Sequence, residues 1–573
     1  MIILLKRNRE VNHWQAMKLE YSKTKILFYI EPRIDLGNPY LREWWLNHFT
    51  LDIINTLKKS DSAERFEYCI TINEPLAQKY GIIDDAIIKI LPQKELFPLL
   101  IGDAVELSIA WYKETYTDGQ MSYYVALMRK YFSDFVPDII ITFTPAPFLR
   151  KAFPDSLILH HEVSFLSEPP YPWVPYLDPL GMYFGHSSFM NKFRNEIKEI
   201  PFTTAQLDYL SKFKGTCQSI IRNKSPYDGL LNPQKEKFDH LVLLPLVGVN
   251  HYGFHGPCKL NIKNEYQFLV HILEQIPQNI GVVVTYPPQL LNPCSNETIA
   301  FLERQYPHFI YHEDFGKYLG VSQYLLAYVD MVVGLGSSIC FQTLLWDKKF
   351  LDLGDMDFIA DASDLDAVEE VLKRDRQNKD NILYWMLTRY TIQKSYLYNP
   401  EWLSKFFINS LDKFRNGGIT FDFFEPIDSD EKIFESFMNG LDGNIPRLNP
   451  LVSYSRLKKF YDDFKPKCDG FHVFQFLEDM ISKGVDAVVA GKRNEGFSIF
   501  SEMLERVNNI KGTLMNNMAI IHINEGRLDE AEQIFNALIN EGFNIDAIRE
   551  NLQKLQHLKN KITQTTPCVA ENK

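Results

Sequence analysis

The sequence DMVVGLGSSICFQTLLW, residues 330–346, decides the fold class of this chain. Its first part is a short apolar run that ends at a glycine, as in a fully buried strand. Its second part, from residue 337, is an apolar run of helical length. The turn GLGSS at 334–338 joins the two. A buried strand that passes through a tight glycine turn into a helix is the repeating unit of a parallel sheet with helices on both faces.

The same unit recurs along the first two thirds of the chain. Compact apolar runs occur at residues 25–30, 138–143, 156–160, 240–245, 281–285 and 350–354. Helical patterns at about 98–133 and at 265–275 lie between members of this series. Two successive series of this kind predict an α/β fold with two Rossmann-like lobes, over residues 1–235 and 236–415. A cleft is expected between the carboxyl ends of their strands.

The C-terminal part of the chain differs from the rest in its sequence composition. Residues 416–470 are rich in glycine and proline, which indicates an irregular linker. The segments NEGFSIF (494–500) and LDEAEQIF (528–535) align with an offset of 35 residues. That offset is close to the 34-residue period of tetratricopeptide repeats. We therefore expect an all-α module of such repeats over residues 471–560, followed by a tail at 561–573.

Composition excludes several classes of protein. The 573 residues carry a net charge of −12 and contain no run rich in Lys and Arg, so nucleic-acid binding is not expected. The seven cysteines are scattered without a CxxC pair, which is typical of reduced thiols. The apolar run at the N-terminus is too short for a signal peptide, and no apolar stretch of about 18 residues spans a membrane. We therefore expect a cytoplasmic protein with no transmembrane segment.

The turn at residues 334–338 is the first candidate for a functional site. Backbone N–H groups at the start of a helix, the helix dipole and two hydroxyls together attract a phosphate. The alternative is a plain helix start, in which the hydroxyl of Ser337 or Ser338 caps the helix. The turn alone does not separate these interpretations, because turns of glycine and serine are common.

Three groups of segments resemble a known family. They are LILHHEVSFL (157–166) with LDPLGMY (177–183), VLLPLVGVN (242–250) with VVTYP (283–287), and GSSICFQTLLWDKKF (336–350). In this order and spacing they resemble the bacterial β-Kdo transferases of capsule and O-antigen assembly. The resemblance covers about residues 135–355. It implies a GT-B fold and a donor in which 3-deoxy-octulosonate (Kdo) is activated by CMP.

Residue by residue, the resemblance implies roles in binding and catalysis. Ser337 and Ser338 would hold the donor phosphate, and Tyr286 stands where the family has the histidine of a His-Pro motif at the nucleotide. A tyrosine hydroxyl can donate to a phosphate, but it carries no positive charge. Glu162 matches the first acid of the family's Glu-Asp-Gly-Phe motif, and Val163 replaces the second.

The most serious departure from the family is Asn250. It occupies the place of the aspartate that attacks the sugar in a double displacement, and an amide is no carboxylate nucleophile. One explanation is an alignment shifted by a few residues. A second is that another group serves instead, such as His251, His255 or Asp228. The third is a single inverting displacement, which needs only a general base.

Glu162 and His161 are the candidates for that base. Burial of Glu162 without a partner would be costly, which favours a functional or paired role. His160 has an alternative role as a core residue bonded to the backbone. The three consecutive residues His160, His161 and Glu162 do not indicate a metal site. Alternate side chains of a strand face opposite ways, and no Cys/His spacing completes a zinc site. We expect no metal and no cofactor.

Two loops have both a binding and a structural interpretation. Glu31 and Arg33 follow the first strand at the cleft, where they either contact an acceptor sugar or form part of a surface loop. Tyr171 and Trp173 lie in an aromatic loop with four prolines, at residues 168–175. They either stack on a sugar face or cap a hydrophobic edge.

These observations predict a glycosyltransferase that uses a sugar nucleotide. The resemblance implies a CMP-linked ulosonate (Kdo or a nonulosonate) as the donor, a surface glycan or a protein being the acceptor. The repeats are expected to bind a protein partner. One alternative is a non-catalytic, degenerate transferase scaffold, supported by the departures at Val163, Asn250 and Tyr286. The other is a GT-B transferase that uses a UDP- or GDP-sugar.

Overall fold

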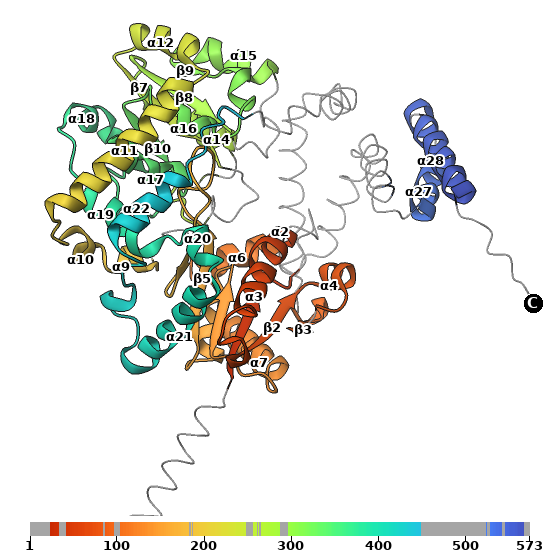
Figure 1. The fold of residues 1–573 in the computed structure, drawn as a ribbon. Helices are drawn as coiled ribbons and strands as arrows, with labels where there is room; N and C mark the ends of the chain where they lie inside the picture. The colour runs from red at the N-terminus through yellow and green to blue at the C-terminus, as the bar shows by residue number, and fades with distance from the viewer. Residues whose placement is uncertain are drawn as a thin grey trace, which may run out of the picture. The chain divides into compact units, whose positions relative to one another are not determined.

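The computed structural model describes residues 23–33, 42–83, 86–96, 104–182, 185, 187–247, 256–260, 262, 265–286, 296–447, 519, 523, 528–540 and 545–565. The chain falls into two compact units, Met1–Ser453 and Tyr454–Lys573. The first unit holds two β-sheets, and each sheet is the centre of one lobe (Figure 1).

The first lobe is built on a six-stranded sheet with the order β3-β2-β1-β4-β5-β6. The strands span Thr24–Tyr29 (β1), Phe66–Ile72 (β2), Ala86–Ile90 (β3), Ile139–Thr142 (β4), Leu157–Val163 (β5) and Pro175–Asp178 (β6). Strands β1 to β5 pair in parallel, and β6 pairs antiparallel to β5. The apolar runs predicted in this part of the sequence form β1, β4 and β5, where helices cover both faces of the sheet.

The second lobe is built on five parallel strands in the order β11-β10-β7-β8-β9. They span His240–Pro245 (β7), Ile280–Thr285 (β8), Phe309–Ile310 (β9), Met331–Gly334 (β10) and Lys349–Asp352 (β11). The apolar runs predicted at 240–245, 281–285 and 350–354 form β7, β8 and β11. The structure therefore confirms the α/β fold with two parallel-sheet lobes.

The helical pattern predicted at about 98–133 is divided into two helices. Helix α6 spans Ala104–Tyr112 and α7 spans Asp118–Tyr131. Between them, Glu114 has a φ of 56°, and Thr117 forms a capping box with Gln120. A threonine whose hydroxyl accepts from the backbone three residues ahead starts a new helix. The apolar periodicity continues across this break and therefore does not reveal it.

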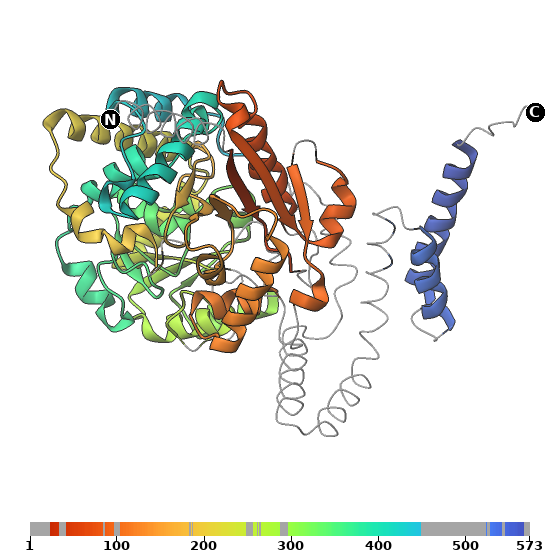
Figure 2. The same ribbon diagram turned by 90° about the horizontal axis from the view of Figure 1, so that it is seen from below.

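Helices from each half of the sequence pack on the opposite lobe. Helix α11 (Thr204–Lys224) contacts α17 (Ser338–Trp346) of the second lobe. Helix α21 (Pro400–Gly417) contacts α3 (Leu51–Leu57) and β5 of the first, so the teal ribbon lies beside the red one in Figure 2. One continuous hydrophobic core includes buried residues of both lobes. The division predicted at residues 235 and 415 therefore does not follow the packing of these two helices.

Residues 418–447, within the predicted linker, are a folded part of the first unit. Helix α22 (Asp430–Asn439) packs on α11, and its residues Ile433, Phe434 and Phe437 are buried. Gly418 has a φ of 71° and ends α21. The glycine that suggested a linker thus marks a helix end, and the linker prediction is corrected for this segment. Residues 448–470 lie outside the described residues.

The second unit contains a pair of packed helices, α27 (Leu528–Asn540) and α28 (Ile545–Thr565). Ala531 and Phe535, the matched positions of the predicted repeat, are buried in their shared core. Residues 494–500, the other half of the match, lie outside the described residues, so the repeat stays a prediction. Helix α28 runs to Thr565, past the predicted end of the module at 560. In the described part of the chain, we find no helix with the length and apolar character needed to cross a membrane.

Candidate functional site

The turn at residues 334–338 lies between the carboxyl end of β10 and the first turn of α17. Gly336 has a φ of 67°, a conformation that favours glycine. A Cβ on Gly334 would lie 2.7 Å from Sγ of Cys340, so strand and helix approach closely because that side chain is absent. Ser337 is the N-cap residue of α17, but its side chain makes no capping hydrogen bond, and Ser338 is exposed. The plain-cap interpretation of Ser337 is therefore not supported.

Tyr286 lies at the same edge of the second sheet as the turn at 334–338. It directly follows β8, and β7 lies between β8 and β10. Because neighbouring strands are about 4.8 Å apart, the ends of β8 and β10 are separated by about 10 Å. Tyr286 is half-buried, and its ring packs edge-on against Tyr311 with centroids 5.7 Å apart. Asn250 itself, with His251 and His255, lies outside the described residues.

Asp228, a further candidate of the sequence analysis, lies at the other edge of the second sheet. It is the first residue of α12 (Asp228–Lys237) and accepts a hydrogen bond from the hydroxyl of Tyr328 at 2.5 Å. Tyr328 precedes β10 and therefore lies at the amino ends of the parallel strands. This contact places Asp228 away from residues 334–338 and gives its carboxylate a structural partner.

A cation that the sequence analysis did not single out lies beside the turn. Nζ of Lys259 is 3.7 Å from Oδ2 of Asp352, the last residue of β11. The carboxylate of Asp352 is buried and accepts from the backbone N–H of Gly354. A Cβ on Gly354 would lie 3.6 Å from the backbone N of Gly336, so the loop after β11 touches the turn. No spacing pattern marks Lys259 in the sequence, because only the folded loop brings it here.

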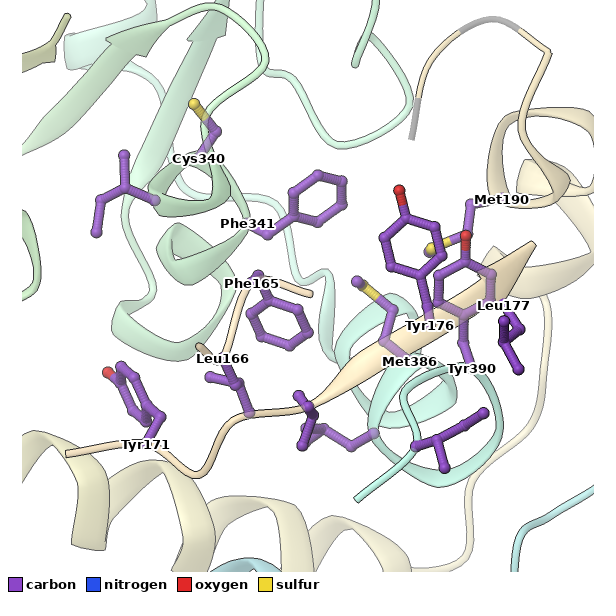
Figure 3. Packing of buried hydrophobic residues seen from close by; sticks show 14 of the residues in the cluster. Phe165, Leu166, Tyr171, Tyr176, Leu177, Met190, Cys340, Phe341, Met386 and Tyr390 are labelled. Carbon is purple, nitrogen blue, oxygen red and sulfur yellow. The ribbon is translucent and has the colours of Figure 1, made fainter. Parts of the chain in front are cut away.

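Glu162 lies near the carboxyl end of β5 and is half-buried. Three residues later, the carbonyl of Phe165 accepts from Nε2 of Gln342 on α17 at 2.8 Å. The ring of Phe165 also faces that of Phe341, with centroids 6.2 Å apart (Figure 3). Glu162 is within about 10 Å of this contact by chain length, and Gln342 is one helical turn, about 6 Å, beyond Ser338. The structure thus brings Glu162 close to the helix that begins at Ser338.

His161 lies on the opposite face of β5 from Glu162, because successive side chains of a strand alternate. It is fully buried, and its ring packs against Trp45, Phe49 and Phe143. Neither ring nitrogen has a hydrogen-bond partner among the residues that the structure describes. Burial holds the pKa of His161 well below its usual value. An imidazole enclosed in this way does not reach a substrate hydroxyl, which argues against a direct role as the base.

His160 has the core role that the sequence allowed as the alternative. Its Nδ1 donates to the backbone carbonyl of Asp178 on β6 at 3.2 Å, and burial lowers its pKa to about 3. The ring is therefore neutral and structural. Within the described residues, no group of three or more His, Cys, Asp or Glu side chains is placed to hold a metal ion.

Mild acid is expected to destabilise the protein through His160 and His161. A histidine in an unfolded chain has a pKa of about 6.5, so below that pH the unfolded state binds more protons and stability falls as the pH falls. Each neutral buried histidine then costs about 0.7 kcal/mol between pH 7 and pH 6. Two carboxyls act in the opposite direction over the same range, because burial raises the pKa values of Asp178 and Asp352 to about 6. Each offsets about 0.35 kcal/mol of this loss between pH 7 and pH 6, so a net loss remains.

His161→Leu is therefore expected to reduce the loss of stability between pH 7 and pH 6 by about 0.7 kcal/mol. Urea unfolding at the two pH values measures this difference. The control is His48→Asn, an exposed histidine on the helical turn that covers His161, which should leave the loss unchanged. The same pH dependence in His161→Leu as in the parent chain would show that His161 is not a neutral buried group.

Glu31 and Arg33 form a buried ion pair, and the surface-loop interpretation is wrong. Each side chain is only 1% exposed, and two hydrogen bonds of 2.6 Å join the guanidinium to the two carboxylate oxygens. Nη2 of Arg33 also lies 3.5 Å from Oγ of Ser108 on α6. Paired and buried, neither residue presents its charge to an acceptor sugar; the pair ties the end of β1 to α6.

An aromatic group lies beside the end of β4. Tyr171 is buried, which fits core packing rather than sugar stacking. The ring of Trp173 is half-exposed and lies 6.0 Å from that of Trp44, which is 41% exposed. Trp45 packs inward against the residue after β4. The sequence analysis did not single out Trp44; the available signal is two consecutive tryptophans, and a π-helical turn of the kind frequent at functional sites follows them.

The two lobes are joined by a hydrogen bond at the edge of the second sheet. The hydroxyl of Tyr112 on α6 donates to Oδ2 of Asp355, which follows β11, at 2.5 Å. A Cβ on Gly185 would lie 1.9 Å from that hydroxyl, so a larger residue there would displace the Tyr112 hydroxyl. The loop after β11 therefore contacts both the first lobe and the turn at 334–338.

No protein-family model matches the chain, and no curated protein matches it either. Among solved structures, the chain is similar to KpsC, the β-Kdo 2,7-transferase of Thermosulfurimonas dismutans, at 12% identity over 66% of this chain and 99% of that one, with a TM-score of 0.35. The β-Kdo 2,4-transferase of the same organism matches at 16% identity over 43% and 79%, with a TM-score of 0.28. A UDP-GlcNAc 2-epimerase from Neisseria meningitidis matches at 13% identity over 68% and 100%, with a TM-score of 0.24. The function proposed below rests on the residues of this chain and not on these likenesses.

Proposed function

We propose that this chain is a glycosyltransferase whose sugar nucleotide binds at the turn of residues 334–338. The observation that carries the proposal is the start of α17, where Ser337 makes no capping hydrogen bond. Unpaired backbone N–H groups and the positive end of the helix dipole meet at such a start. Lys259, which pairs with Asp352 at 3.7 Å, places an ammonium group that can donate to a phosphate beside the adjoining loop. A phosphate-bearing ligand is the one that this combination favours.

Glu162 is the general base in this proposal. It takes the proton of an acceptor hydroxyl, whose oxygen forms a bond to the anomeric carbon of the donor sugar. The bond from that carbon to the phosphate oxygen breaks, and the nucleotide leaves with the electron pair. The start of α17 and Lys259 stabilise the charge that develops on the leaving phosphate. This single displacement inverts the anomeric carbon and needs no carboxylate nucleophile at Asn250.

The donor that we propose is a CMP-linked ulosonate, and the acceptor is a surface glycan or a protein. The resemblance of residues 135–355 to β-Kdo transferases supports the donor class. The hydroxyl of Tyr286 would donate to the nucleotide. Trp44 and Trp173 offer partly exposed aromatic rings for the apolar face of an acceptor sugar. We also propose that the repeats predicted at 471–560 bind a protein partner.

The scaffold alternative is favoured by one set of observations, the departures from the family at Val163, Asn250 and Tyr286. A degenerate fold of this kind would bind no sugar nucleotide, or bind one without turnover. A UDP- or GDP-sugar transferase would share the fold and differ in the nucleobase of the donor that it recognises. Binding experiments with a series of nucleotides, together with an assay of donor turnover, separate all three.

We expect CMP to stabilise the protein against thermal unfolding more than UMP, UDP, GDP or ADP does. A ligand at about 100 times its dissociation constant adds roughly 2.7 kcal/mol. In the double variant Ser337→Ala, Ser338→Ala the dissociation constant of CMP is expected to rise about tenfold, because hydrogen bonds to a charged phosphate are lost. A thermal-shift titration measures both effects.

The matched control is Ser133→Ala, an exposed serine at the end of α7 whose hydroxyl donates only to a backbone carbonyl. It should leave CMP affinity unchanged. Unchanged affinity in the double serine variant would place the phosphate site elsewhere. Stabilisation by UDP or GDP alone would reject the CMP donor, and no stabilisation by any nucleotide would favour the scaffold.

A further inference from the structure

A surface pocket of the first unit shares no lining residue with the candidate donor site. It lies between α21, labelled in Figure 1, and residues 421–427, and it is bounded by the helical turn η5 (Met386–Tyr390). Its cavity volume is ≈ 170 Å³. Pockets for drug-sized ligands enclose about 300–1,000 Å³. This pocket therefore admits one small ring with its substituents and excludes a whole nucleotide.

The pocket has an excess of positive charge. Lys413 is already satisfied, because it donates to the backbone carbonyls of residues 422 and 423 and pairs with Glu425 at 2.8 Å. That pair also neutralises Glu425, the one carboxylate of the lining. Within the described residues, the side chains of Arg389 and Lys405 make no ion pair or hydrogen bond. Two residues of the lining therefore carry positive charges that no carboxylate in the described residues pairs with.

One wall of the pocket is aromatic and fixed in orientation. Trp402 and Phe406 are one turn apart on α21, and their rings stack with centroids 5.2 Å apart and an interplanar angle of 12°. Nε1 of Trp402 donates to the carbonyl of Ile427 at 3.3 Å, which holds the indole against the opposite wall. Asn409 adds an amide that can donate and accept. Both rings are half-buried and so keep part of their surface accessible.

Arg389 is presented by an unusual piece of backbone. It lies in a π-helical turn, where the N–H of Thr391 bonds to the carbonyl of Met386, five residues earlier. Single π-helical turns are rare and occur frequently at functional sites. The buried neighbours of Arg389 in this turn fix its backbone, so the guanidinium projects from a rigid base.

We propose that this pocket binds one negatively charged sugar unit. The ring lies against Trp402 and Phe406, and its carboxylate or phosphate lies between Arg389 and Lys405. A guanidinium matches either group with two parallel hydrogen bonds. The apolar face of a sugar ring suits an aromatic wall, and Asn409 meets its hydroxyls. The pocket is a binding site for an anionic glycan separate from the site of transfer, and it does not depend on the donor that we propose.

The test is isothermal titration calorimetry of the full chain without any nucleotide. The acidic probes are methyl β-D-glucuronide and glucose 6-phosphate. The comparison ligands are methyl β-D-glucoside, which lacks the charge, and inorganic phosphate, which lacks the ring. At least one acidic sugar is expected to bind at one site, at least about tenfold tighter than either comparison ligand. The double variant Arg389→Gln, Lys405→Gln should weaken that binding about tenfold or more.

Two controls localise the effect. Lys432→Gln, an exposed lysine on α22 outside the pocket, should bind the sugar as the parent chain does. The double variant Ser337→Ala, Ser338→Ala should also keep the parent chain's affinity for the acidic sugar, which separates this pocket from the donor site. The proposal is overturned if no acidic sugar binds, if the glucoside or phosphate binds as tightly, or if the Arg389 and Lys405 variant keeps full affinity.

Discussion

Replacing Glu162 with glutamine is expected to lower the turnover number by about 10²- to 10⁴-fold, the range that a general base contributes. The amide keeps the size of the side chain and its place on β5, but it does not take a proton from the acceptor hydroxyl. The affinity for the donor is expected to stay within about twofold, because in the proposed mechanism the donor phosphate binds at the start of α17 and not to Glu162. Release of the nucleotide in a single-turnover assay measures the first quantity, and thermal-shift titration measures the second.

Glu168→Gln is the matched control for this substitution. Glu168 lies six residues further along, is half-buried, and has a pKa that burial raises. It accepts from Nε2 of Gln323 at 3.4 Å, so its role is to fix the loop after β5 on the second lobe. Full turnover in Glu162→Gln would remove Glu162 as the base. An equal loss in both variants would mean that the loop and not the proton transfer had been disturbed.

The site edge of the second sheet could be predicted from the sequence because its signals are local. The runs at 240–245, 281–285 and 330–334 are bounded by breakers, and parallel strands end at one edge. Ser337 and Tyr286 follow two of these strands, so their meeting at one edge requires no knowledge of side-chain packing. The same reasoning assigned Asn250 to this edge, and it stays a prediction because that residue lies outside the described residues.

The rest of the site depends on contacts between distant parts of the chain. Glu162 and His161 are neighbours in sequence, yet Trp45 and Phe49, more than 100 residues earlier, enclose only His161. Lys259 reaches the turn at 334–338 only because the loop after β11 folds back onto Gly336. No hydrophobic periodicity or short motif predicts these contacts, because they form only when the lobes pack together.

Asp178→Ala is expected to destabilise the first unit by about 3–5 kcal/mol. The buried carboxylate accepts four hydrogen bonds of 2.7–2.9 Å, from the backbone N–H groups of Leu180, Gly181 and Phe189 and from the hydroxyl of Tyr390. Leaving the three buried donors unpaired costs about 1–3 kcal/mol each, and the half-buried N–H of Leu180 costs less. Burial raises the pKa of Asp178 from 3.8 to about 6, a difference of about 2 pH units, so relief of the buried charge returns about 3 kcal/mol at pH 7. The lost hydrogen bonds outweigh this relief.

Two smaller substitutions are expected to lower the stability of the protein less than Asp178→Ala does. Tyr390→Phe removes one of the four donors and keeps the ring stacked on Tyr176 (Figure 3), so it should cost about 1 kcal/mol. Asp178→Asn keeps one acceptor oxygen and should fall between Tyr390→Phe and Asp178→Ala in urea unfolding. Because Asp178 pairs with His160 across β5 and β6, its loss should also disturb the strand that carries Glu162. If Asp178→Ala unfolds at the same urea concentration as the parent chain, these four hydrogen bonds do not hold the β5–β6 corner in place.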